Sequence, residues 1–559
     1  MKQDIAGQGK GYQTEANYIG QVGDRTYNYG GQEITVSGVG EPPPNYADYW
    51  VDRISYESQL RDRLTTSPVT QIVADGGFGK SSLAAWAFDR VMFDKRVWVC
   101  FRREHSFDRF ARYVLQELGR PVKDPQANED LLLRELVLRL NDPNGSVKMV
   151  VMDQVENAIG QSDWQWYESF LSQWAEEGRR SAVLVTSRSS VLSTSPIALA
   201  GLTEAEGIAF FDREGVTGEG RSELITLASG HPLLLKLAAA WAKETYGARV
   251  DDRAIDFFGK LFTNYAGDPT AEVSAIFDVV FEALPIVLQQ TLAKLSVYRL
   301  PIGLEMAQAI ETKTEFEDLE LLVSRGLLLL QDDRFVLHPL VESLVRSKLT
   351  EDDRTVAHEA AIKFYEVNYQ EWDGTIESCR EELEIFYHAC EFGQYGRANT
   401  ELDDCENVLY QMGYYREILP LYVRLVGEWV PDNEAEKKEL GWVLIQLGEL
   451  YDKLAQYQQA LTAHEKAQII FEQLNYPEGI AASLGSQGNL YISLRKFQKA
   501  IDLQQQSLKL NRELENHEGE ADALCDLGNA YQSLGEQQCE MGNNECRRQC
   551  FKAIERTFR

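Results

Sequence analysis

The C-terminal part of the chain repeats itself at a fixed spacing of 40 residues. Glycine, tyrosine and leucine recur at this spacing, and two further pairs of similar residues align in the same way: Tyr457 with Phe497, and Gly479 with Gly519. Small and aromatic residues at such offsets let paired helices pack closely and stack into a solenoid. The aligned positions are Gly448, Gly488 and Gly528, then Tyr451, Tyr491 and Tyr531, then Leu454, Leu494 and Leu534.

This pattern resembles tetratricopeptide repeats of a slightly lengthened type, which we place at residues 441–559. Weaker helical pairs before them predict degenerate repeats over residues 351–440. The last repeat loses its pattern after Gly535, where a polar stretch with cysteines begins. The array is therefore either capped irregularly or truncated.

A different pattern occupies the region from Pro68 to about residue 198. Short, nearly continuous apolar runs alternate with amphipathic stretches of helical length, which predicts a parallel sheet covered on both faces. We therefore expect a multidomain α/β plus all-α protein, with the α/β domain at residues 45–198. The apolar runs are 70–73, 96–101, 148–152 and 182–186.

The first strand of this domain leads into a glycine-rich segment that opens a helix, which is the setting of a P-loop. Backbone N–H groups of such a loop surround a phosphate, and the helix N-terminus adds its positive dipole end. Lys80 would reach the outer phosphates, and the Ser81 hydroxyl would bind Mg2+. Ala74 stands where the P-loop pattern has its first glycine. The segment runs Asp75, Gly76, Gly77, Phe78, Gly79, Lys80, Ser81, Ser82.

Two later strands end in polar residues suited to the same site. Asp153 closes an apolar strand and would be a second Mg2+ ligand. Gln154 follows it where an acid often orients the attacking water, so hydrolysis should be slow. Glu156 comes two residues later, and Arg188 follows the next strand, within reach of a γ-phosphate.

Strand signals fade after about residue 200, and two more domains are expected. Residues 199–268 read as a helical domain that contains Gly230-His231-Pro232-Leu233. Residues 269–350 combine helices with two short strands, which suggests a winged helix.

In this order, residues from about 50 to 345 resemble the NB-ARC family of STAND ATPases. Trp50-Val51-Asp52-Arg53 is similar to the short motif that precedes the P-loop, and the run at 96–101 is similar to the family's second strand. The resemblance implies that Pro232 packs on adenine and that His338 meets the β-phosphate of ADP. Pro339 replaces an aspartate that is common in plant members.

The resemblance also implies a function. ADP would hold the winged helix closed, and exchange for ATP would release it for oligomerisation, with the repeats sensing a ligand or partner. We therefore expect ATP, ADP and Mg2+ as cofactors, a slow ATPase acting as a switch, and a role such as defence or programmed cell death by analogy.

Residues 1–44 form an N-terminal tail that ends in a proline linker, and they are rich in Gly, Asn, Gln and Tyr. Asn17-Tyr18-Ile19-Gly20-Gln21 recurs as Asn28-Tyr29-Gly30-Gly31-Gln32, so side chains could stack in a cross-β assembly and recruit an effector. The alternative is a flexible tail, or a hairpin turning at Gly23-Asp24.

Composition narrows the alternatives. A net charge of -31 opposes binding to nucleic acid, so a STAND-type transcriptional regulator is the weaker alternative. A repeat scaffold that binds nucleotide without turnover is the other. We see no signal peptide and no long apolar run, which predicts a cytoplasmic protein without a membrane segment.

Overall fold

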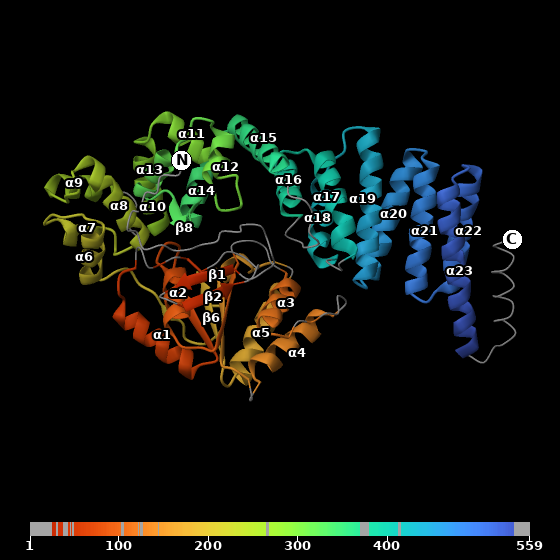
Figure 1. The fold of residues 1–559 in the computed structure, drawn as a ribbon, viewed down its shortest axis with the longest axis horizontal. Coiled ribbons are helices and arrows are strands. Elements are labelled where there is room, and N and C mark those ends of the chain that lie inside the picture. The colour runs from red at the N-terminus through yellow and green to blue at the C-terminus, as the bar shows by residue number, and fades with distance from the viewer. Residues whose placement is uncertain are drawn as a thin grey trace, which may run out of the picture. The chain divides into compact units, whose positions relative to one another are not determined.

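The computed structural model divides the chain into two compact units (Figure 1). The first comprises residues 1–123 and 127–384, and the second comprises residues 124–126 and 385–559. The domain boundaries within these units remain predictions. The described residues are 25–29, 32–36, 43–44, 46, 50–101, 106–120, 122, 127–142, 145–161, 163–263, 268–331, 333–368, 379–411 and 415–540.

A five-stranded parallel sheet organises the first part of unit 1, as the alternating pattern predicted. Its strand order is β4-β5-β6-β3-β7. The two-residue strand β7 was not predicted, because two residues are too short to show a pattern. The strands are β3 (Val69–Val73), β4 (Lys95–Cys100), β5 (Lys148–Asp153), β6 (Ala182–Ser187) and β7 (Ile197–Ala198).

Helices cover both faces of this sheet. Alternate residues of each strand point to opposite faces, so Val97 and Val99 enter one core while Trp98 and Cys100 enter the other. Figure 1 shows the helices on either side of the strands. One face packs against α1 (Ile54–Thr66) and α2 (Lys80–Arg90), the other against α3 (Phe107–Glu117), α4 (Glu129–Leu140) and α5 (Trp164–Glu177).

The helical segment that follows the sheet begins with a capping box. The Thr203 hydroxyl accepts the Glu206 N–H, and the Glu206 carboxylate accepts the Thr203 N–H. The helices are α6 (Glu204–Arg213), α7 (Arg221–Leu227), α8 (Pro232–Thr245) and α9 (Asp252–Thr263).

Helices followed by a hairpin make up the region predicted as a winged helix. The two strands pair antiparallel, with Leu329 opposite Val336. The elements are α10 (Pro269–Glu282), α11 (Ile286–Leu295), α12 (Leu304–Ile310), α13 (Phe316–Ser324), β8 (Leu329–Gln331), β9 (Arg334–Val336) and α14 (Pro339–Ser347). Helix α15 (Glu351–Val367) follows them, in the region predicted as degenerate repeats.

From α16 onward the described chain is helical, and its last helices keep the 40-residue register. The helices end at equivalent left-handed residues: Ala455 and Arg495 both have φ 57°, and Asn475 and Glu515 have φ 48° and 56°. The helices are α16 (Arg380–Glu391), α17 (Tyr395–Gln411), α18 (Tyr415–Glu428), α19 (Glu434–Lys453), α20 (Tyr457–Gln473), α21 (Pro477–Ser493), α22 (Phe497–Glu513) and α23 (His517–Glu540).

The repeated glycines lie where two helices touch. A Cβ at Gly488 would lie 2.7 Å from Gln504 Nε2, and one at Gly448 would overlap the ring of His464. These glycines are therefore required by close packing rather than by flexibility. Helix α23 continues to Glu540, beyond the point where the repeat pattern fades.

Within the tail, β1 (Arg25–Tyr29) pairs antiparallel with β2 (Gln32–Val36). The hairpin that the structure describes is formed by residues after Gly23-Asp24, and that dipeptide itself lies outside the described residues. The first of the two similar segments, residues 17–21, lies outside the described residues. In the part of the chain that the structure describes, no helix has the length and hydropathy of a membrane span.

Candidate functional site

The glycine-rich segment connects β3 to α2 as a P-loop does. Gly77 and Gly79 have φ of 81° and 87°, the left-handed region that glycine adopts without strain. Gly79 is the residue before the first turn of α2, and a Cβ there would meet nothing within 4 Å. The loop therefore curls tightly in front of the helix N-terminus.

The carbonyl groups of this loop are held by side-chain donors. In a trans peptide the C=O and the N–H of the next residue point in opposite directions. When a side-chain donor binds a loop carbonyl, the N–H of the next residue therefore points away from that donor. Such a row of N–H groups makes an anion-binding nest. The contacts are Lys80 Nζ to Ala74 O (2.8 Å) and Asp75 O (2.9 Å), His231 Nε2 to Gly76 O (3.0 Å), and Arg53 Nη1 to Phe78 O (3.5 Å).

Lys80 is a buried cation at the start of α2. Its side chain is largely withdrawn from water, and burial lowers its pKa, while the negative charge of Glu156 opposes that shift most strongly. A buried ammonium is costly without a nearby anion. Lys80 is thus placed to favour a bound phosphate.

Asp153 and Ser81, the two predicted Mg2+ ligands, lie within hydrogen-bonding distance of each other. Asp153 Oδ1 accepts hydrogen bonds from the hydroxyls of Ser81 (2.8 Å) and Thr186 (2.5 Å). The carboxylate is 2% exposed, and burial raises its pKa to about 6. A serine hydroxyl beside a buried carboxylate is a pair of hard oxygen ligands of the kind that Mg2+ prefers. Ser82 follows in the same helical turn.

Gln154 comes directly after β5 in an unusual backbone conformation. Its φ is 61°, which a residue with a side chain rarely adopts, and its N–H donates to Thr186 Oγ1 at 2.8 Å. Strained backbone of this kind is often found at functional sites.

Glu156 is a site residue that the sequence reasoning did not choose. One carboxylate oxygen, Oε2, is buried without a hydrogen-bond partner, and Oε1 lies 3.4 Å from Arg188 Nε. Arg188 also lowers the pKa of Lys80. Arg188 therefore lies beside an acid two residues after Gln154 and close enough to Lys80 to act on its charge.

Two His-Pro dipeptides start helices at the P-loop. His231 is the N-cap of α8 and Pro232 its first residue, and the His231 ring lies 4.5 Å from the ring of Phe78 between centroids. His338 is the N-cap of α14, where its Nδ1 accepts the Leu340 N–H at 3.2 Å.

Leu340 brings α14 against the loop. A Cβ on Gly76 would lie 2.9 Å from Leu340 Cδ1. His338 and Pro232 are thus adjacent to residues that touch the loop.

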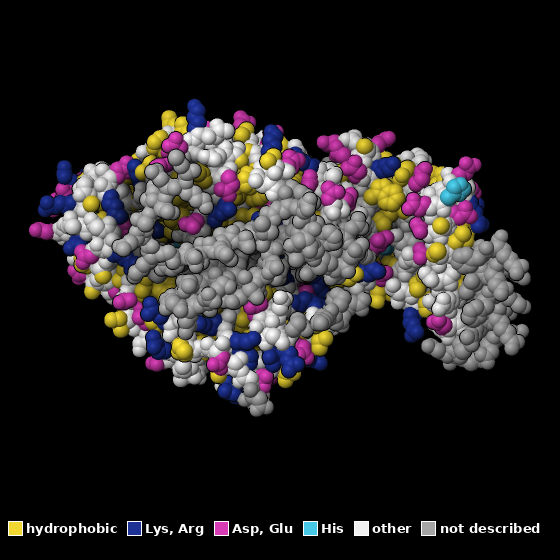
Figure 2. Space-filling model, in the orientation of Figure 1, with side chains coloured by type: hydrophobic (Ala, Val, Ile, Leu, Met, Phe, Trp, Pro, Cys, Tyr) yellow, Lys and Arg dark blue, Asp and Glu magenta, His cyan; other side chains and the backbone are white. Residues whose placement is uncertain are grey.

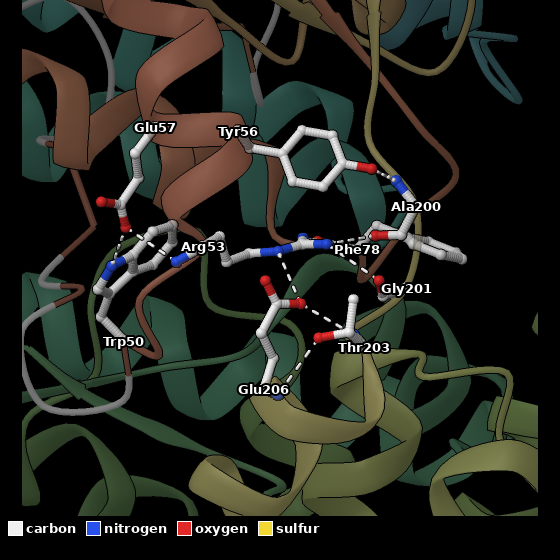
Figure 3. A network of polar contacts seen from close by, with 9 residues as sticks. All are labelled: Trp50, Arg53, Tyr56, Glu57, Phe78, Ala200, Gly201, Thr203 and Glu206. Carbon is white, nitrogen blue, oxygen red and sulfur yellow. Dashed lines mark hydrogen bonds and ion pairs between the residues drawn. The ribbon is translucent and has the colours of Figure 1, made fainter.

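Arg53 connects three segments around this site (Figure 3). Its guanidinium donates to Ala200 O at 2.7 Å and Gly201 O at 3.1 Å, lies 3.9 Å from the Glu206 carboxylate, and stacks over the Tyr56 ring at 4.7 Å. The side chain is 3% exposed. Arg53 therefore links the segment before the P-loop to the start of α6 by hydrogen bonds and an ion pair.

Family models match two parts of the chain. Residues 55–215 match the NB-ARC domain, and residues 479–538 match the tetratricopeptide repeat. The chain contains an NB-ARC domain and C-terminal tetratricopeptide repeats. NB-ARC domains are P-loop NTPase modules of the STAND class, and the P-loop, Asp153 and Arg188 lie inside the matched range. No curated protein matches the sequence.

Several solved structures are similar to this chain. A STAND protein with a tetratricopeptide repeat sensor from Pyrococcus horikoshii is 17% identical, with a TM-score of 0.47 over 93% of this chain and 78% of that one. A Walker-type ATPase from Pyrococcus abyssi is 11% identical, with a TM-score of 0.30 over 55% and 98%. The Orc1 protein of Aeropyrum pernix in complex with DNA is 15% identical, with a TM-score of 0.29 over 55% and 94%. Because these scores are below 0.5, the assignment rests on the family models.

Proposed function

We propose that this protein is a nucleotide-controlled switch that binds ADP and ATP with Mg2+ at the P-loop. The observation that carries the proposal is the set of contacts around the loop: the carbonyls of Ala74 and Asp75 accept hydrogen bonds from Lys80, and those of Gly76 and Phe78 face His231 and Arg53 from other segments. A loop set in this way needs little rearrangement to bind phosphate, which favours affinity.

The residues present fit a magnesium nucleotide. Ser81 and Asp153 would hold Mg2+ through their oxygens, and Lys80 would bind the outer phosphates. Mg2+ would neutralise charge on the phosphate oxygens. Asp75, Gly77, Gly79 and Ser82 would contribute backbone or hydroxyl donors to the same group.

Slow hydrolysis is the expected activity. Gln154 can orient water but cannot accept its proton, and Arg188 would stabilise charge on the γ-phosphate. Glu156 holds Arg188 by an ion pair at 3.4 Å. An arginine tied to an acid in this way is less available to a phosphate, which also favours slow turnover.

Switching would depend on the start of α14. Leu340 packs against Gly76, and His338 caps the same helix, so the P-loop and the predicted winged helix share a contact that a bound nucleotide can strengthen or weaken. A two-state element biased in this way is a switch. Pro232 would pack on adenine, and the repeats would bind the partner or ligand whose arrival favours release and oligomerisation, in a signalling role such as defence.

Figure 2 shows acidic and basic side chains interspersed over the described part of one face.

The tail could transmit the signal by self-association, because the segment at residues 28–32 spans the end of β1 and the start of β2. A peptide of residues 10–38 should then form thioflavin-positive fibres, and its failure to seed would remove that part of the proposal.

A scaffold that binds nucleotide without turnover is the second candidate. Ala74 at the first glycine position and Gln154 after Asp153 favour it. Turnover by the wild type that Lys80→Ala abolishes would exclude this candidate.

The test of the main proposal is to denature the purified protein and identify any retained nucleotide by chromatography. We expect ADP in the wild type, none in Lys80→Ala and less in His338→Ala. Lys509→Ala is the matched control, because this lysine is 77% exposed in α22. A wild-type protein that carries no nucleotide and binds neither ADP nor ATP would refute the proposal.

A further inference from the structure

Both ring nitrogens of His231 have a partner. Nδ1 faces the Leu234 N–H at 3.2 Å, and Nε2 faces the Gly76 carbonyl at 3.0 Å. A backbone N–H can only donate, so Nδ1 must be the unprotonated nitrogen. The hydrogen is then on Nε2, which donates it to the P-loop carbonyl. The two partners together fix one tautomer of a neutral imidazole.

The surroundings of the ring keep it neutral. His231 is 1% exposed, and burial lowers its pKa to about 4, although the hydrogen bond to the Gly76 carbonyl opposes this shift more strongly than the charges of Asp75 or Lys80 affect it. Protonation would also place a hydrogen on Nδ1 against the Leu234 N–H. The ring therefore keeps both its Nδ1 acceptor and its Nε2 donor throughout the physiological pH range.

The ring also supports the loop by contact. A Cβ on Gly77 would lie 2.6 Å from His231 Cε1, and the ring of Phe78 meets the imidazole nearly edge-on at 4.5 Å. Three consecutive loop residues thus rest on one side chain from the start of α8, 155 positions away in sequence.

We propose that His231 is a positioning residue for nucleotide binding, which holds the Gly76 carbonyl outward so that the Gly77 N–H faces the phosphate. This inference rests on the proposed function of the P-loop. Because the donor belongs to α8, a movement of α8 would also release the Gly76–Gly77 peptide, so the helical segment and the phosphate site are coupled through this one bond.

Two substitutions separate the roles of the two nitrogens. His231→Asn keeps an acceptor near Nδ1, so it can still cap α8, but it is too short to reach Gly76. His231→Gln carries an N–H near Nε2, so it can still hold Gly76, but it leaves the Leu234 N–H uncapped. If His231 only stabilises the helix, His231→Gln should weaken ADP binding more than His231→Asn does. If His231 positions the loop, His231→Asn should weaken ADP binding more.

The measurement is the affinity for ADP with Mg2+ by titration calorimetry, together with the thermal midpoint of each full-length variant. We expect about tenfold weaker ADP binding by His231→Asn, near wild-type binding by His231→Gln, and a lower midpoint for His231→Gln than for His231→Asn. Wild-type affinity in His231→Asn, or equal weakening in both, would overturn the inference. Lys80→Ala is the reference: if the wild type binds no ADP, the proposed function itself fails.

Discussion

Replacing Asp153 with asparagine is expected to stabilise the metal-free protein at pH 8, although it removes a proposed Mg2+ ligand. The carboxyl group is 2% exposed and accepts both of its hydroxyl hydrogen bonds on the one oxygen, Oδ1. An asparagine Oδ1 can accept the same two bonds. The substitution therefore removes a buried charge and keeps both hydroxyl partners, although it places an amide nitrogen where Oδ2 lies.

The size of this effect follows from the pKa of the carboxyl group. Burial raises it from 3.8 to about 6, so the folded protein binds this proton more tightly than the unfolded chain. Its favourable contribution is complete below pH 3.8 and is lost as the pH rises through 6. At about 1.4 kcal/mol per pKa unit, the ionised carboxylate costs about 3 kcal/mol at pH 8 and roughly half as much at pH 5.

The assay is thermal unfolding of protein freed of nucleotide and kept in chelator between pH 5 and pH 8. We expect the midpoint of Asp153→Asn to exceed that of the wild type by roughly 4 °C at pH 8 for a unit of this size, and by about half as much at pH 5. Added Mg2+ and ADP should stabilise the wild type more than the variant. A loss of stability, or a gain that does not change with pH, would show that burial of this charge is not the cause.

Two further substitutions test close contacts. Gly448→Ala should lower the thermal midpoint by overpacking the ring of His464, at a cost of about 1–3 kcal/mol, while Gly427→Ala, where a Cβ would meet nothing within 4 Å, should not. Gly76→Ala should speed release of retained ADP, measured by chase with excess ATP, because its Cβ would lie 2.9 Å from Leu340 Cδ1. Adding Leu340→Ala should slow ADP release again. If the double variant releases ADP as fast as Gly76→Ala, the effect arises in the nucleotide site itself and not from the contact with Leu340.

The sequence was sufficient for features that depend on local pattern. Four strands of the sheet were predicted within one residue at each end, because a parallel sheet covered on both faces needs apolar residues on both sides of every strand. The repeat register was predicted for a similar reason: Gly448 and Gly488 mark contacts that recur wherever two helices of a repeat meet.

Residues whose importance comes from distant contacts were harder to predict. Glu156 has an ordinary place after Gln154, and only the fold puts its carboxylate beside Arg188 and near Lys80. In the sequence, the motif that contains His231 was noted only for the proline that follows it, and no role was predicted for the histidine. Its signal was present, because histidine before proline at a helix start offers Nδ1 as a cap, but the Gly76 carbonyl that engages Nε2 lies far away in the chain.

The glycines of the P-loop have a second reason to be glycine. From the sequence, Gly76 and Gly77 are required because phosphate must approach the backbone. In the folded chain a side chain at either position would also collide with another part of unit 1, with Leu340 at the start of α14 or with His231 at the start of α8. Because Gly76 and Gly77 have no side chain, a phosphate can approach one side of the loop and the starts of α14 and α8 can pack against the other. A change in either set of contacts alters the position of these two peptides, so variants at Gly76 and His231 should change how well the nucleotide is retained.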